Sequence, residues 1–209
     1  MSQTKGQKVQ IRAYGVKVLL SHHPRVRRLK RLHFPSGHGN KFWTSSWLLM
    51  DFFNRKGLPA RSRVMDVGCG WGLAGIYCAK KHDAVVTAID TDSEIFPFLQ
   101  LHAEINGVQV ATMKRAFGGL THADLEGFDV LIGADICFWE TLTYSLKRLI
   151  NRALRSGIKL VLIADPGRST FDELAEYFVE KQGGKILNRT VHRPRRIRGR
   201  ILKIGSIND

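Results

Sequence analysis

With 209 residues, of which 44% are hydrophobic and 24% charged, the chain has the composition of one soluble globular domain, and no apolar run approaches the roughly 20 residues that cross a bilayer. The three cysteines include no Cys-x-x-Cys pair, which argues against a disulfide framework or a zinc site, so we expect no metal and a cytoplasmic protein. The net charge of +15 is unevenly placed: residues 1–50 hold ten Lys and Arg and no acid, and residues 181–209 hold nine against one acid.

The first basic flank, residues 1–42, is expected to be a partly helical or flexible extension that precedes a single domain over residues 43–209. Within it, the segment 25–31 carries five basic side chains. Such a cluster favours a polyanion or an acidic protein as partner, although it can also serve solubility alone.

From Ser62 onward, short β-rich apolar runs alternate with helical patterns. The expected strands are Arg63–Val67, Ala84–Ile89, Val108–Met113, Phe128–Ile132 and Ile158–Ala164, and the expected helices are Gly72–Lys80, Ser93–Ile105, Glu140–Arg155 and Thr170–Gln182. This alternation predicts an α/β fold with a mostly parallel sheet covered by helices on both faces. The last two β runs, Lys185–Val191 and Arg198–Ile204, have no helix between them and should form a terminal hairpin.

The most informative segment is VMDVGCGWG at residues 64–72, where a hydrophobic strand enters a glycine-rich turn that opens a helix. Glycines adopt positive φ there and let a ligand lie against bare backbone beside a helix N-terminus. The GxGxG spacing and the acid Asp66, two positions before Gly68, disfavour an NAD-dependent oxidoreductase and favour a ligand with a positively charged amino group. Asp90, 20 residues beyond Gly70, suits a pair of ribose hydroxyls.

The segments VMDVGCGWG and AIDTD (88–92) resemble motifs I and II of the class I methyltransferases. The resemblance implies S-adenosylmethionine as cofactor and a seven-stranded Rossmann-like sheet in the order 3-2-1-4-5-7-6, with strand 7 antiparallel. It also implies cofactor contacts from Trp43, Asp66, Gly68, Cys69, Gly70, Gly72, Asp90, Phe117 and Asp135. In that arrangement Asp66 lies near the methionine amino group, Asp90 holds the ribose and Phe117 neighbours the adenine.

The segment GADICFWE (133–140) and the turn Asp165-Pro166-Gly167-Arg168 look like the protein-lysine methyltransferase branch, and in particular like electron-transfer flavoprotein β-subunit lysine methyltransferase. This resemblance implies a lysine acceptor, with Asp135, Phe138 and Glu140 as the catalytic residues that hold and orient its amine. Phe138 stands where tyrosine is common in that branch. Bacterial relatives are labelled nicotinamide N-methyltransferase-like, so a small-molecule acceptor is an alternative.

The second basic flank contains Arg196, Arg198 and Arg200 at alternating positions, which in a strand places them on one face about 6–7 Å apart. That spacing approximates successive phosphates on one strand of RNA. We favour a protein substrate, possibly acidic, and keep as alternatives an RNA methyltransferase and a binding protein that has lost catalysis. The sequence does not indicate an oligomeric state.

Overall fold

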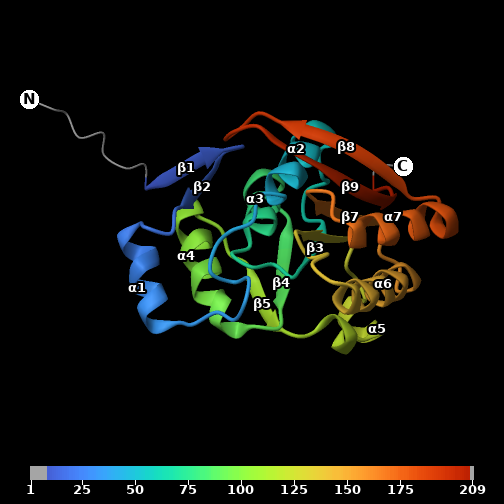
Figure 1. The fold of residues 1–209 in the computed structure, drawn as a ribbon, viewed down its shortest axis with the longest axis horizontal. Helices are drawn as coiled ribbons and strands as arrows, with labels where there is room; N and C mark the ends of the chain where they lie inside the picture. The colour runs from blue at the N-terminus through green and yellow to red at the C-terminus, as the bar shows by residue number, and fades with distance from the viewer. Residues whose placement is uncertain (1–8, 208–209) are drawn as a thin grey trace, which may run out of the picture.

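The computed structural model describes residues 9–207, and its centre is a seven-stranded sheet (Figure 1). The strands are β3 (Arg63–Val67), β4 (Val85–Asp90), β5 (Ala111–Lys114), β6 (Val130–Ala134), β7 (Leu160–Asp165), β8 (Lys185–Val191) and β9 (Ile197–Gly205). They lie in the order β5-β4-β3-β6-β7-β9-β8, and β9 runs antiparallel to both of its neighbours. The expected fold class, strand order and terminal hairpin are therefore confirmed.

Helices cover both faces of this sheet. One layer contains α2 (Ser46–Lys56), α3 (Leu73–His82) and α4 (Phe96–Asn106), and the other contains α5 (His122–Leu125), α6 (Glu140–Arg155) and α7 (Ser169–Gln182). Neighbouring strand residues enter different cores because strand side chains alternate between faces: Val64 packs in the core that contains Trp47, and Met65 in the core that contains Leu146. Burial of these two apolar layers stabilises the domain.

Several expected elements begin later than the sequence suggested: β6 starts at Val130 instead of Phe128, β7 starts at Leu160 instead of Ile158, and two others differ by more. The helix expected from Ser93 starts as a short 3₁₀ turn, η1 (Ser93–Ile95), which the Asp92 side chain caps by accepting the Glu94 N–H at 2.9 Å. The α-helix itself starts at Phe96, where a proline near its N-terminus fits the first helical turn. The strand expected from Val108 starts only at Ala111, whereas α6 has the expected bounds.

A small hairpin and a helix precede the sheet, and the sequence patterns did not identify the hairpin. Its strands are β1 (Gln10–Ala13) and β2 (Val16–Leu19), and α1 (Pro24–Leu32) follows. Side chains of α4 bind the β2 backbone: Asn106 accepts the Lys17 N–H at 2.8 Å and donates to the Lys17 carbonyl at 2.8 Å, and His102 Nε2 accepts the Leu19 N–H at 3.1 Å. Burial lowers the pKa of His102, which keeps the ring neutral and able to accept.

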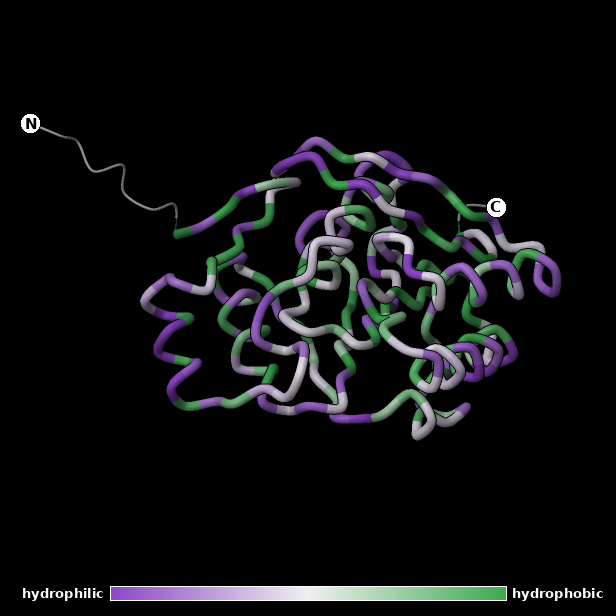
Figure 2. The backbone as a smooth tube through the Cα atoms, viewed as in Figure 1, coloured by the Kyte–Doolittle hydropathy of each residue, from purple (hydrophilic) through white to green (hydrophobic). Residues whose placement is uncertain are grey.

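The row of three arginines expected on one face of the last strand is only partly present, because β9 contains Arg198 and Arg200 but not Arg196. Arg196 lies before β9, and Arg200 is bound to Asp172 of α7 with a shortest N–O distance of 2.7 Å. The hydrophilic stretches of the chain instead concentrate on outer elements such as α1, while the central strands are hydrophobic (Figure 2). Within residues 9–207, no helix combines the length and the apolar character needed to cross a membrane.

Candidate active site

A cavity of about 370 Å³ opens at the carboxyl ends of β3, β4 and β6. Its wall combines the loop before α2, the β3–α3 turn, the end of β4 and the segments that follow β5 and β6. Open parallel sheets bind ligands at this edge, near the point where successive crossovers leave in opposite directions, which here lies between β3 and β6. The volume is in the range of small-molecule and cofactor sites.

The three glycines of the β3–α3 turn all have positive φ, but they serve different purposes. A Cβ atom on Gly70 would meet no atom within 4 Å, so the backbone there faces open space in the cavity. A Cβ on Gly68 would lie 2.6 Å from Ile136, and one on Gly72 would lie 2.6 Å from Leu99. Gly70 therefore leaves room for a ligand, whereas the other two allow close packing.

Asp90 joins the glycine turn to the end of β4. One carboxylate oxygen accepts the Gly70 N–H at 3.2 Å and the other accepts the Asp92 N–H at 3.1 Å. Burial raises the pKa of Asp90, and the side chain lines the cavity. The position of this carboxylate fits the binding of two adjacent hydroxyl groups at the cavity wall.

Asp66 lies behind the glycine turn, at a smaller chamber of about 20 Å³ that Cys69 also lines. The carboxylate is 3% exposed and accepts the Gly75 N–H at 3.0 Å, and burial raises its pKa to about 7. A Cβ on Gly75 would meet Val86 at 2.8 Å and the Asp66 carboxylate at 3.0 Å, so this position requires glycine. Burial also raises the pKa of the Cys69 thiol, which therefore stays protonated.

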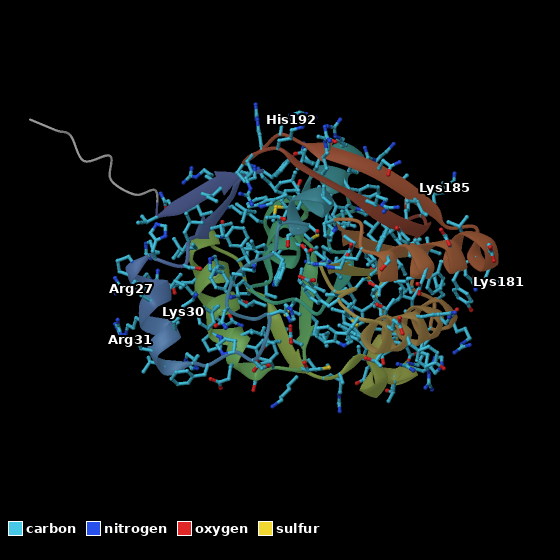
Figure 3. All side chains as sticks on the ribbon, viewed as in Figure 1. Arg27, Lys30, Arg31, Lys181, Lys185 and His192 are labelled. Atoms are coloured by element: carbon cyan, nitrogen blue, oxygen red, sulfur yellow. The ribbon has the colours of Figure 1, made fainter. Side chains whose placement is uncertain are left out.

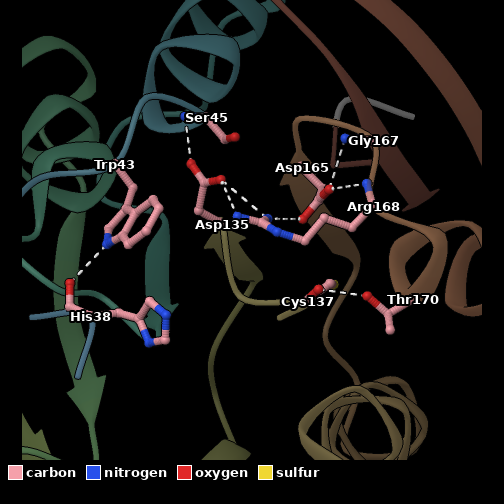
Figure 4. Close-up of polar contacts among 9 residues, drawn as sticks. All are labelled: His38, Trp43, Ser45, Asp135, Cys137, Asp165, Gly167, Arg168 and Thr170. Atoms are coloured by element: carbon pink, nitrogen blue, oxygen red, sulfur yellow. Dashed lines mark hydrogen bonds and ion pairs between the residues drawn. The ribbon is translucent and has the colours of Figure 1, made fainter. Parts of the chain in front are cut away.

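Asp135 is held by three contacts at the end of β6 (Figure 4). One carboxylate oxygen accepts the Ser45 N–H at the start of α2 at 2.8 Å, and the other lies 3.3 Å from both terminal nitrogens of Arg168. The same guanidinium donates to Asp165 at 2.5 Å, and Asp165 also accepts the Gly167 N–H at 2.8 Å. Asp135 has a φ of 59°, a left-handed conformation that is uncommon outside glycine and that clusters at functional sites.

Aromatic rings also line the cavity. His38 stacks on Phe138 with ring centroids 4.1 Å apart, and Trp43 meets Phe138 edge-on at 5.1 Å. The Trp43 indole N–H donates to the His38 carbonyl at 2.9 Å, which fixes the loop before α2 over the cavity (Figure 4). Trp139 lines the mouth and is 48% exposed. The Arg168 guanidinium lies 4.4 Å from the centre of the Phe138 ring, which links this group to the carboxylates.

The structure therefore brings together most of the residues that the sequence singled out. The cavity is lined by Trp43, Gly68, Gly70, Asp90, Phe117, Asp135 and Phe138, and the smaller chamber by Asp66 and Cys69. Gly72 lies outside both linings, and Glu140 is exposed at the first residue of α6, also outside the lining. Sequence reasoning missed His38, Trp139 and Gly75, and it considered Arg168 only as a turn residue.

Comparison with known proteins agrees with this geometry. Residues 64–157, which run from β3 through α6, match the family model described as a methyltransferase domain. Over this span, a little under half of the chain, the protein is similar to methyltransferase domains. The glycine turn lies in this span, where Gly70 leaves the cavity wall open, and Asp90 lines the same cavity.

Two relatives illustrate the similarity of the methyltransferase domain to protein methyltransferases. The chain is 24% identical over 141 residues to the electron transfer flavoprotein beta subunit lysine methyltransferase of Danio rerio, a match that covers 67% of this chain and 54% of the relative. It is 29% identical over 164 residues to a histidine protein methyltransferase 1 homolog of Dictyostelium discoideum, covering 72% of this chain and 50% of that one. The chain thus spans about half the length of the curated relatives it matches.

Solved structures share the fold of the methyltransferase domain at low sequence identity. A methyltransferase from Pyrococcus furiosus matches with a TM-score of 0.62 and 16% identity, over 87% of this chain and 97% of that one. TrmK of M. capricolum, solved with S-adenosyl-homocysteine, matches with a TM-score of 0.54 and 12% identity, over 78% of this chain and 68% of that one. These similarities support the architecture and carry no information on the acceptor.

Proposed function

We propose that this chain transfers the methyl group of S-adenosylmethionine to a lysine side chain of a protein. One observation carries the proposal: among the described residues, the cavity lining holds Asp90, Asp92 and Asp135 and no lysine or arginine, in a chain of net charge +15. A carboxylate-lined cavity attracts a cationic donor and an amine acceptor and repels phosphates. The lysine methyltransferase relative adds support from sequence.

The chain's own residues divide into a donor side and an acceptor side. On the donor side, Asp90 would accept hydrogen bonds from the ribose, Gly70 would leave its backbone open to the cofactor, and Phe117 would contact the adenine. Asp66, at the small chamber beside the glycine turn, would face the amino group of the methionine moiety. When bound, S-adenosylmethionine supplies a methyl group on a positively charged sulfur, which is activated for in-line displacement.

On the acceptor side, Asp135 would attract the lysine ammonium, because Arg168 and the Ser45 N–H hold its carboxylate at the cavity wall. Phe138 and Trp139 would contact the aliphatic stem and the ammonium by packing and cation–π attraction. Glu140 would add negative charge just outside the lining. The lysine would have to lose one proton to water before its neutral amine could accept the methyl group that the cofactor would supply.

Incubation of cell extract with methyl-labelled cofactor tests the acceptor class. We expect label in a protein fraction that resists ribonuclease and is removed by protease, and methyl-lysine after hydrolysis. Asp135→Asn, which keeps the shape and removes the charge, should reduce this labelling strongly. Label that survives protease and is released by ribonuclease, or label only in small molecules, would contradict the proposal.

The pH dependence separates lysine from histidine, which is the acceptor named for the Dictyostelium relative. In water the pKa of a lysine side chain is about 10.4 and that of a histidine side chain about 6.5. The reactive amine is the deprotonated form, so with a lysine acceptor the rate should rise about tenfold per pH unit from pH 7 to pH 9. A rate that is flat above about pH 7.5 would indicate histidine instead.

A further inference from the structure

One face of α1 is a cluster of unpaired cations, which we call the α1 basic face: Arg27, Lys30 and Arg31 (Figure 3). These positions are three and four residues apart and therefore lie on the same side of the helix, where like charges repel. Arg25 of the same helix pairs with Glu104 at 2.7 Å, but none of the three side chains of the basic face has a hydrogen-bond or ion-pair partner among the described residues. No acid occupies the first turn of α1, so no charge within the helix balances this face.

The C-terminal end of α1, which carries the basic face, lies close to the cavity in the chain. The helix ends at Leu32, and Ser36 already lines the cavity, so three residues separate them, and the four steps of chain span at most about 14 Å. Hydrogen bonds hold this connection in place: Glu94 accepts the Phe34 N–H at 3.2 Å, and Asp92 accepts the Ser36 N–H at 2.6 Å. The basic face therefore has a defined position relative to the cavity mouth.

The two surfaces carry opposite charge. The cavity presents Asp90, Asp92 and Asp135, while the adjacent helix face presents three cations. An RNA strand crossing both would bring its phosphates against the cavity carboxylates, which is unfavourable. A protein segment with a lysine for the cavity and acidic residues for the helix matches both surfaces.

We propose that the α1 basic face docks an acidic segment of the protein whose lysine enters the cavity, an inference that rests on the proposed lysine acceptor. The four steps of chain from Ser36 to Leu32 and the helical rise back to Arg27 amount to at most about 22 Å, which about four to eight residues of extended peptide can span. The acidic residues of the substrate therefore lie about that far from the methylated lysine. The affinity depends on salt, because the contacts are exposed and electrostatic.

Two fluorescent peptides test the docking. Each is about 20 residues long and has one lysine, and an acidic run starts about five residues away: four glutamates in the first peptide and four glutamines in the second. We expect the glutamate peptide to bind at least about tenfold more tightly at low salt, and this advantage to shrink as salt is added. Equal affinity of the two peptides for the unmodified chain would overturn the proposal.

Matched charge reversals locate the contact. R27E/R31E changes the α1 basic face, and K181E/K185E makes the same change in net charge at exposed positions at the other end of the molecule (Figure 3). We expect R27E/R31E to lower the affinity for the glutamate peptide to that of the glutamine peptide, and K181E/K185E to change it less than twofold. Far-UV circular dichroism and the affinity for S-adenosylmethionine should be unchanged in both variants, because no altered residue touches the cavity.

The outcomes separate this proposal from the lysine acceptor itself. If the glutamate peptide is methylated, R27E/R31E should raise its KM about tenfold and leave kcat unchanged, because docking acts equally on substrate and transition state. Equal losses in the two double variants would overturn the docking face. So would a single-stranded oligoribonucleotide that displaces the glutamate peptide and loses affinity only in R27E/R31E. Binding that depends on α1 without any methylation would support the docking face and count against lysine as acceptor.

Discussion

Replacement of Arg168 by alanine removes the one cation shared by two buried carboxylates. Asp135 is 3% exposed and Asp165 is fully buried, and the guanidinium contacts both. Loss of one partner from a buried ion pair costs about 3–5 kcal/mol, because the remaining charge is left uncompensated. Backbone N–H groups still bind both carboxylates in the variant, so we expect the lower end of that range, about 3 kcal/mol. For a chain of this size that loss lowers the Tm by about 6–12 °C.

Calorimetric or urea unfolding measures this loss, and the chain offers a matched control. Arg25 and Glu104 form a pair at 2.7 Å with side chains 47% and 67% exposed, so Arg25→Ala should cost no more than about 1 kcal/mol. Adding Asp135→Asn to Arg168→Ala should recover about 1 kcal/mol, because it removes one of the two unpaired charges. A loss no larger than that of Arg25→Ala, or the absence of any recovery, would refute this account.

Three further predictions concern the donor side of the cavity. Asp90→Ala should weaken binding of S-adenosylmethionine by about 30- to 100-fold, because two charge-assisted hydrogen bonds to the ribose are lost. Titration calorimetry measures this affinity, and an unchanged value would exclude the assigned ribose contact. Gly75→Ala should destabilise the fold by about 1–3 kcal/mol in thermal unfolding, since its Cβ would meet Val86 at 2.8 Å. An unchanged stability would mean that the side chains around Gly75 can shift without cost. The third prediction concerns Asp66, whose pKa is raised from 3.8 to about 7. The folded state therefore retains a proton that the unfolded state has lost, and stability falls as pH rises from about 4 to about 7, by up to about 1.4 kcal/mol per unit. Asp66→Asn should remove this part of the pH profile, and a profile that Asp66→Asn leaves unchanged would show that Asp66 does not titrate in that range.

The parts of the fold that the sequence predicted well are those whose signals are local. Each strand of the parallel sheet is a short apolar run, and the glycine turn and Asp90 lie within one βαβ unit. The hairpin of β1 and β2 has no comparable signal, because its strands have four residues each and the turn between them is Tyr14-Gly15. What holds it in place is Asn106, 89 residues away along the chain.

In the candidate site, too, the sequence predicted residues in local motifs but not contacts between residues distant in the chain. Asp135 was predicted as a site residue from the resemblance of its segment to a methyltransferase branch. Its ion pair with Arg168 joins residues 33 positions apart and depends on the side-by-side pairing of β6 and β7. His38 lies in an irregular loop without any pattern, so only its stacking on Phe138 reveals it. Glu140 was grouped with Asp135 by the same resemblance, but at the first residue of α6 it does not line the cavity, and its role stays a prediction.

The carboxylate lining of the cavity also has a consequence for turnover. Under the proposed function, methyl transfer would convert a positively charged sulfonium into a neutral thioether, while Asp90, Asp92 and Asp135 would keep their places in the wall. The electrostatic attraction of the wall would therefore be weaker for the spent donor than for the fresh one. That difference would help a new donor molecule to replace the by-product.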